Sequence, residues 1–72
     1  MTEAPDKPQP IRTREYMENM TLEKVKEATD AELGKPNRTP IGDHAAGSLK
    51  VKSVTVDGNP DRWRVLYEWE PV

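Results

Sequence analysis

The chain has 72 residues, of which a third are hydrophobic and a third are charged, and its formal net charge at pH 7 is −2. A chain of this length forms one small domain at most. It contains no cysteine, which excludes a disulfide framework, a thiolate metal site and a thiol nucleophile. No hydrophobic stretch is long enough for a signal peptide or a membrane-spanning helix, so we expect a cytoplasmic protein without a membrane partner.

The beginning of the chain is rich in proline and poor in hydrophobic residues. Segments of this composition cannot bury enough apolar surface to offset the entropy of ordering. The sequence therefore predicts a disordered tail over residues 1–11 and a single small domain over residues 12–72.

The next segment has the hydrophobic spacing of a helix. Residues 14–33 repeat hydrophobic side chains close to the 3.6-residue period, and Gly34 gives a stop signal. Thr21 fits the N-cap position of a helix. Two interpretations stay open: one continuous helix over 14–33, or a helix pair over 13–20 and 22–33.

A short second helix is expected at residues 39–49. Thr39 can cap it, and Pro40 would occupy the first turn, where a missing N–H is harmless. Three hydrophobic residues with helical spacing follow: Ile41, Ala45 and Leu49. Gly42 and Gly47 oppose this helix, since each lowers helix propensity by about 1 kcal/mol.

From Leu49 onward the hydrophobic period changes to two, which predicts a C-terminal antiparallel β-hairpin. The second strand alternates most regularly, with inward-facing Trp63, Val65, Tyr67 and Trp69. In the first strand, Val51 is odd-numbered but Val54 is even-numbered. We therefore expect a β-bulge near residues 52–53 that returns both to one face.

The predicted hairpin loop is the four-residue segment 57–60, which contains glycine, asparagine and proline. This loop would set Val54 opposite Trp63 and would place Lys52 or Ser53 beside Arg64 on the outward face. Like charges placed opposite each other are destabilising. Such a pair would need relief from a glutamate of the second strand or from a bound anion.

No catalytic or metal-binding set emerges from the sequence. His44 is the only histidine, and a lone histidine without sulfur or further nitrogen ligands cannot build a zinc site. Four residues match oxygen positions of a calcium-binding loop: Asp57, Asn59, Asp61 and Glu68. Arg62 occupies the position that needs glycine, so we interpret these residues as a hairpin turn. We expect no metal, no small-molecule cofactor and no enzymatic activity.

The charges are unevenly distributed along the chain. Residues 1–34 carry eight acidic and five basic residues, whereas residues 35–64 carry six basic and three acidic residues. The six basic residues are candidate binding residues: Lys35, Arg38, Lys50, Lys52, Arg62 and Arg64. This asymmetry favours an anionic partner for the hairpin half of the molecule.

The expected order of a helix or helix pair, a short helix and a hairpin resembles the winged-helix layout. The resemblance implies a recognition helix at 39–49 and a wing at 50–64 whose basic residues contact DNA phosphates. Thr39-Pro40-Ile41 and Gly47-Ser48-Leu49 are together similar to segments of phage head–tail completion proteins. A compact chain with a charged, proline-rich tail also fits a phage or accessory-gene product.

We therefore predict a small α+β protein that works as a non-enzymatic protein-interaction module. Its few large hydrophobic residues favour a protein partner or self-association to complete the core. The alternative is a nucleic-acid-binding regulator that uses the basic face of the hairpin.

Overall fold

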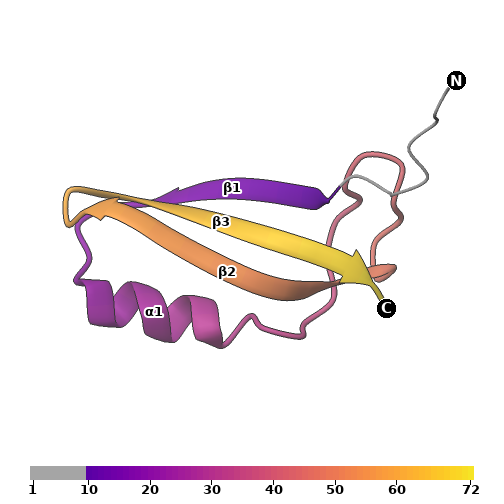
Figure 1. The fold of residues 1–72 in the computed structure, drawn as a ribbon, viewed down its shortest axis with the longest axis horizontal. Coiled ribbons are helices and arrows are strands. Elements are labelled where there is room, and N and C mark those ends of the chain that lie inside the picture. The colour runs from indigo at the N-terminus through magenta and orange to yellow at the C-terminus, as the bar shows by residue number, and fades with distance from the viewer. Residues whose placement is uncertain (1–9) are drawn as a thin grey trace, which may run out of the picture.

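The computed structural model describes residues 10–72 and contains one helix beside a three-stranded antiparallel sheet (Figure 1). The elements are β1 (Ile11–Met17), α1 (Leu22–Asp30), β2 (Leu49–Asn59) and β3 (Arg62–Pro71). The strand order is β1-β3-β2, so the central strand is the last one in the chain. The predicted α+β class and C-terminal hairpin are confirmed. Residues 1–9, which make up most of the predicted tail, lie outside the described residues.

The predicted helix over 14–33 is wrong in its first part, because residues 11–17 form strand β1. Side chains of Ile11, Thr13 and Met17 are partly buried, and the residues between them are exposed. β1 pairs along its whole length with β3, from Ile11 opposite Trp69 to Met17 opposite Trp63. This long-range pairing overrides the weak local helical pattern, as tertiary context commonly does.

Helix α1 begins where the sequence predicts a cap. The Thr21 hydroxyl oxygen accepts a hydrogen bond from the backbone N–H of Lys24 at 3.3 Å, which satisfies one of the free donors of the first turn. The helix buries Val25 and Thr29 against the sheet. A helix of nine residues is too short to be stable alone, so this packing holds it.

The predicted short helix at 39–49 is absent, and with it the winged-helix layout. Residues 38–48 instead form a loop containing a tight turn in which Ile41 and His44 exchange backbone hydrogen bonds of 2.9 Å. Gly42 has a φ of 57° and Gly47 has a φ of 83°. Both angles are left-handed and incompatible with an α-helix, so the two glycines decide against the helical stripe.

The buried side chain of Asn37 organises this loop. Its amide nitrogen donates to the carbonyl oxygens of Thr39 at 2.9 Å and Ala45 at 3.1 Å. Its amide oxygen accepts from the backbone N–H groups of Gly47 at 2.9 Å and Leu49 at 3.0 Å. One side chain thereby joins both ends and the middle of the loop, and its own hydrogen-bonding capacity is fully used.

In the hairpin, the predicted bulge is confirmed and the predicted register is wrong. The pairing of β2 with β3 shifts between Val51 and Ser53, which places Val51 and Val54 on the same face. Val54 lies opposite Tyr67, however, and not opposite Trp63. The hairpin is therefore longer than expected, and its connection is shorter.

The turn explains the longer strands. Ladder pairing continues to Asn59 opposite Arg62, which leaves only Pro60 and Asp61 as the connection. The Asn59 side-chain oxygen accepts from the N–H groups of Asp61 at 3.0 Å and Arg62 at 3.2 Å. Gly58 has a φ of 116°, and a Cβ atom there would lie 2.5 Å from the carbonyl oxygen of Arg62. Only glycine fits at this position.

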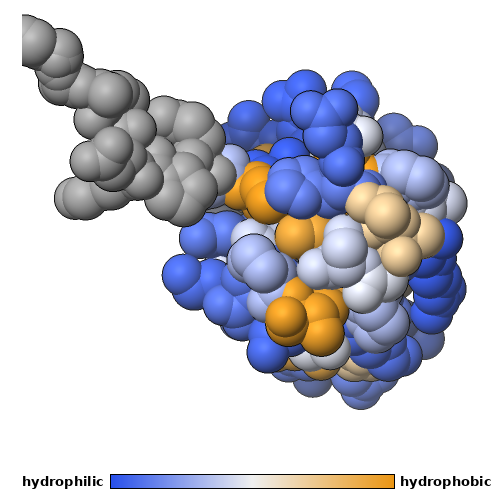
Figure 2. All heavy atoms as spheres, turned by 90° about the vertical axis from the view of Figure 1, so that its right-hand side faces the viewer, coloured by the Kyte–Doolittle hydropathy of each residue, from blue (hydrophilic) through white to orange (hydrophobic). Residues whose placement is uncertain are grey.

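The core lies between α1 and the inner face of the sheet. Its buried hydrophobic residues are Val25, Val51, Trp63, Val65 and Tyr67. The ring-bearing side of β3 is therefore buried, as predicted from its alternation. At the end of the molecule opposite the hairpin turn, hydrophobic residues form separate small patches on a hydrophilic surface (Figure 2). No helix among residues 10–72 has the length and hydrophobicity to span a bilayer.

Candidate binding site beside the edge strand

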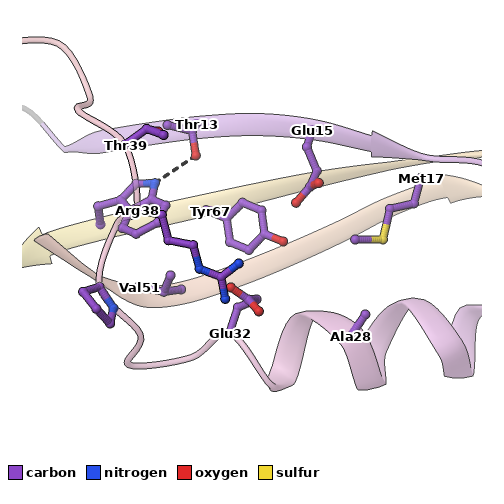
Figure 3. Close-up of a pocket in the computed structure, with 11 residues that line it drawn as sticks. Thr13, Glu15, Met17, Ala28, Glu32, Arg38, Thr39, Val51 and Tyr67 are labelled. Carbon is purple, nitrogen blue, oxygen red and sulfur yellow. Dashed lines mark hydrogen bonds between the residues drawn. The ribbon is translucent and has the colours of Figure 1, made fainter. Parts of the chain in front are cut away.

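A cleft of about 590 Å³ opens between the inner face of β1 and the C-terminal end of α1 (Figure 3). Helix α1 packs closest to β2, which forms the opposite edge of the sheet. The inner face of β1 is therefore left partly uncovered. The cleft is lined by Thr13, Glu15, Met17, Ala28, Glu32, Pro36, Arg38, Thr39, Val51, Tyr67 and Trp69. It combines a hydrophobic floor with a few polar groups, the usual composition of a binding site.

The floor of the cleft is aromatic. The rings of Tyr67 and Trp69 lie on neighbouring inward positions of β3, with centroids 6.1 Å apart. The indole N–H of Trp69 donates to the Thr13 hydroxyl oxygen on β1 at 2.8 Å (Figure 3). This bond between adjacent strands fixes the indole and leaves its apolar surface available to the cleft.

Three charged side chains converge above this floor. Glu15 extends from β1 toward the Tyr67 hydroxyl, and Glu32 and Arg38 approach from the opposite wall (Figure 3). Burial, and then the carboxylates of Glu15 and Glu32, raise the pKa of Tyr67 well above its usual range. A tyrosine phenol is neutral at physiological pH, and the raised pKa keeps it neutral at alkaline pH, so it can donate a hydrogen bond into the cleft.

The cleft adjoins the free edge of the sheet. Strand β1 pairs only with β3 within residues 10–72, so alternate residues of this seven-residue strand direct their N–H and C=O groups to the free edge without a strand partner. The far edge is different, because the start of β2 is covered. There, the N–H of Gly34 donates to Val51 at 2.9 Å, and the N–H of Val51 donates to Lys35 at 3.1 Å.

The six basic residues predicted as a binding set do not form one patch. Arg38 lies in the cleft, and Lys35 lies in the turn after α1. The other four lie on β2 and β3: Lys50, Lys52, Arg62 and Arg64. The structure therefore divides the predicted site between two sides of the sheet.

Five of these six residues have an acidic neighbour. Lys50 pairs with Glu70 at 4.0 Å and Lys52 with Glu68 at 3.6 Å. The shortest contact joins Arg64 to Asp57 at 2.8 Å, and the hydrogen bonds between them lower the pKa of Asp57 and raise the pKa of Arg64. These pairs are exposed and contribute little to stability. They replace the predicted contact of Lys52 with Arg64.

Two of the three remaining basic residues pair with acidic residues of the N-terminal half. Lys35 lies 3.8 Å from Glu32, and Arg62 lies 4.0 Å from Glu18. Among the described residues, Arg38 is the member of the predicted set that has no ion pair. The set is thus mostly neutralised by neighbouring carboxylates.

The sequence prediction missed the contributions of β1 to the cleft, because these residues were assigned to a helix. Thr13, Glu15 and Met17 line the cleft from that strand. The signal that could have found them is the alternation of Ile11, Thr13 and Met17 with polar residues, which fits a period of two as well as a helical one.

The fold and the cleft define a small two-layer α+β protein in which one helix covers part of an antiparallel sheet. Comparison of the chain with protein-family models, with curated proteins and with solved structures finds no match.

Proposed function

We propose that the chain is a non-enzymatic protein-interaction module that binds an extended segment of another protein at the free edge of β1. The bound segment becomes a fourth strand of the sheet, and its inward-facing side chains enter the cleft. The observation that carries this proposal is the position of the cleft directly beside the free edge of β1. Addition of a strand to an exposed edge is a common mode of peptide recognition.

The strand edge supplies affinity. An edge strand presents N–H and C=O groups in a row, and a second chain can pair with them without any change in the fold. The seven residues of β1 offer a length typical of strands in globular proteins. The covered start of β2 offers no such row, which favours β1 as the docking edge.

The side chains of β1 supply selectivity. Arg12 and Arg14 are exposed and, within residues 10–72, have no ion pair. Residues of an added strand that lie opposite them would face outward, where acidic side chains are favoured. The alternate residues would point toward Thr13, Glu15 and Met17 and reach the aromatic floor. We expect a bound segment with acidic residues at every second position and basic or hydrophobic residues between them.

Self-pairing of β1 in a continuous two-fold sheet is disfavoured by charge in the three registers that overlap most of the strand. A register centred on Arg14 places that residue opposite its own copy, and a register centred on Glu15 does the same for the carboxylate. A register centred on Thr13 places Arg12 opposite Arg14. Like charges in opposite positions are destabilising, so the edge is better suited to a different chain than to a second copy.

Selection of random displayed peptides against the folded protein tests the proposal. The selected peptides are expected to show alternating acidic residues and to perturb the NMR signals of β1 and of Arg38. They should also slow hydrogen exchange of β1 amides that exchange rapidly in the free protein. Peptides that perturb only the hairpin turn or the exposed side of α1 would refute the proposal.

A matched pair of variants locates the binding. Glu15→Gln removes a cleft carboxylate and should weaken binding of a selected peptide roughly fivefold to thirtyfold, which corresponds to about 1–2 kcal/mol. Glu27→Gln makes the same chemical change on the exposed surface of α1, outside the cleft, and should leave affinity unchanged. Equal effects of the two variants would show that net charge, and not the cleft, determines binding.

A further inference from the structure

The face of the sheet opposite α1 carries a separate surface. Pairing places one residue of each strand side by side in rows across it: Arg12–Glu68–Ser53, Arg14–Leu66–Thr55 and Tyr16–Arg64–Asp57. Helix α1 joins the core on the inner side and leaves this face uncovered (Figure 1). We call these rows, together with the flanking residues Lys50, Lys52, Arg62 and Glu70, the outer face.

The outer face is positively charged on a chain whose formal net charge is −2. It carries six basic residues: Arg12, Arg14, Lys50, Lys52, Arg62 and Arg64. Four of them pair with the acidic residues Glu18, Asp57, Glu68 and Glu70. The two basic residues of this face without an ion pair among the described residues are Arg12 and Arg14, which stand two residues apart on β1. Their guanidinium groups are available to an anion.

An aromatic ring lies next to these guanidinium groups. Tyr16 is 45% exposed, which is unusual for an aromatic residue in a chain with so few of them. The guanidinium of Arg62 lies 4.0 Å from the centre of its ring, and that of Arg14 lies at 5.8 Å. Planar guanidinium groups and tyrosine rings are both surfaces on which nucleobases stack. The partly exposed Leu66 extends this surface toward the middle of the sheet.

We infer that the outer face binds single-stranded nucleic acid. Arg12 and Arg14 contact successive phosphates along β1, and unpaired bases stack over Tyr16 and Arg62 on the adjoining part of the sheet. The stacking surface favours a single strand over a duplex, because a duplex buries the faces of its bases. The face offers only Tyr16 and Leu66 as large hydrophobic side chains, too little for insertion into a lipid surface.

This inference uses the outer face of the sheet and not the cleft, but it shares Arg12 and Arg14 with the peptide proposed at the β1 edge, so the two ligands should compete. It retains nucleic acid as a partner but replaces the winged-helix geometry. Of the basic residues predicted from the sequence, Arg62 supplies a stacking plane, whereas Lys35 and Arg38 take no part. The two arginines that contact phosphate belong to the strand that was expected to be helical.

Fluorescence anisotropy of a labelled oligothymidylate and a labelled oligouridylate, each of about 12 nucleotides, tests the inference. With two phosphate contacts, from Arg12 and Arg14, affinity should fall roughly sevenfold between 50 mM and 200 mM salt. The variant Arg12→Ala/Arg14→Ala should reduce the slope of log affinity against log salt concentration by the amount expected for about two phosphate contacts. The variant Tyr16→Ala should weaken binding at least fivefold or so at fixed salt.

The matched control is Lys24→Ala/Lys26→Ala, which removes the same charge from the exposed side of α1 and should leave binding unchanged. Equal loss in this control, absence of salt-dependent binding, or equally tight binding to phosphatidylserine vesicles or polyglutamate would overturn the inference. If an outer-face variant fails to fold, NMR of the unmodified protein decides. Titration with the oligonucleotide must then shift the signals of β1 and of Leu66 and leave those of α1 unchanged.

Discussion

Replacement of Asn37 by alanine should destabilise the protein more than any other single change in the loop. Of the four hydrogen bonds that are lost, two leave groups that keep another partner. The N–H of Gly47 also donates to the backbone oxygen of Asn37 at 2.8 Å, and the carbonyl of Ala45 also accepts from the N–H of Ser48 at 3.1 Å. These two losses should each lower stability by about 0.5–1.5 kcal/mol at most.

The decisive group is the N–H of Leu49. This residue is only 1% exposed, and the amide oxygen of Asn37 is its hydrogen-bond acceptor. Without it, a buried donor is left unsatisfied, at a cost of about 1–3 kcal/mol. The expected decrease in the free energy of unfolding for Asn37→Ala is therefore about 2–4 kcal/mol, a large fraction of the roughly 4–11 kcal/mol expected for a domain of this size.

Urea unfolding followed by tryptophan fluorescence measures this effect. Thr39→Ala, an exposed position in the same loop, is the control and should change stability by less than about 0.5 kcal/mol. Asn37→Asp keeps the volume but replaces the two N–H donors with a carboxylate oxygen, so it should also destabilise. If Asn37→Ala remained within about 0.5 kcal/mol of the unmodified protein, the side chain would not organise the loop.

Three further results are expected. Val25→Ala, at a fully buried position of α1, should lower the free energy of unfolding by about 2–3 kcal/mol in the same urea assay, and an unchanged midpoint would exclude Val25 from the core. Gly58→Ala should lower the melting temperature, because its Cβ would lie 2.5 Å from the Arg62 carbonyl oxygen and such strain costs about 1–3 kcal/mol; calorimetry showing no decrease would contradict this geometry. Burial and the neighbouring carboxylates raise the pKa of Tyr67, which favours the neutral phenol in the folded state, so stability should be full below about pH 10 and fall above it. Tyr67→Phe should flatten that alkaline decrease, and an equally steep decrease in both proteins would refute the assignment.

Features that depend on neighbouring residues could be predicted from the sequence. The bulge followed from the change of parity between Val51 and Val54, and the N-cap followed from Thr21, because both depend on a few adjacent residues. The helix predicted over 39–49 was wrong for a reason that the sequence itself partly shows. Two glycines stand there, and the buried amide of Asn37 gives the backbone hydrogen-bond partners that a helix would otherwise supply.

Features that depend on distant residues could not be predicted. Whether residues 11–17 form a helix or a strand is decided by pairing with β3, about 50 residues further along the chain, and the local pattern fits both periods. The hairpin register depended on whether Gly58 belongs to the loop or to the ladder. Gly58 pairs with Trp63 within the ladder, at a φ of 116° that glycine tolerates, and this pairing moves Val54 from Trp63 to Tyr67.

Both wrong predictions, the helix for residues that form β1 and the hairpin register, also affected the prediction of the candidate site. Charge alone identified basic residues on the hairpin, but the cross-strand partners that neutralise them follow from the register. Lys52 meets Glu68 and Arg64 meets Asp57 only in the observed pairing. The cleft itself needs β1 as its wall, so no prediction that placed Glu15 on a helix could have located it.

Gly58, near the end of β2, also affects how distant homologues of this chain can be recognised. An added methyl group at position 58 would collide with the main chain itself, and main-chain atoms cannot move aside as a flexible side chain can. Divergent sequences that share this architecture should therefore keep a glycine two residues before the Pro60–Asp61 turn even where most other positions have drifted. A search profile weighted on that glycine and on Asn37 should detect such sequences when overall identity is too low to do so.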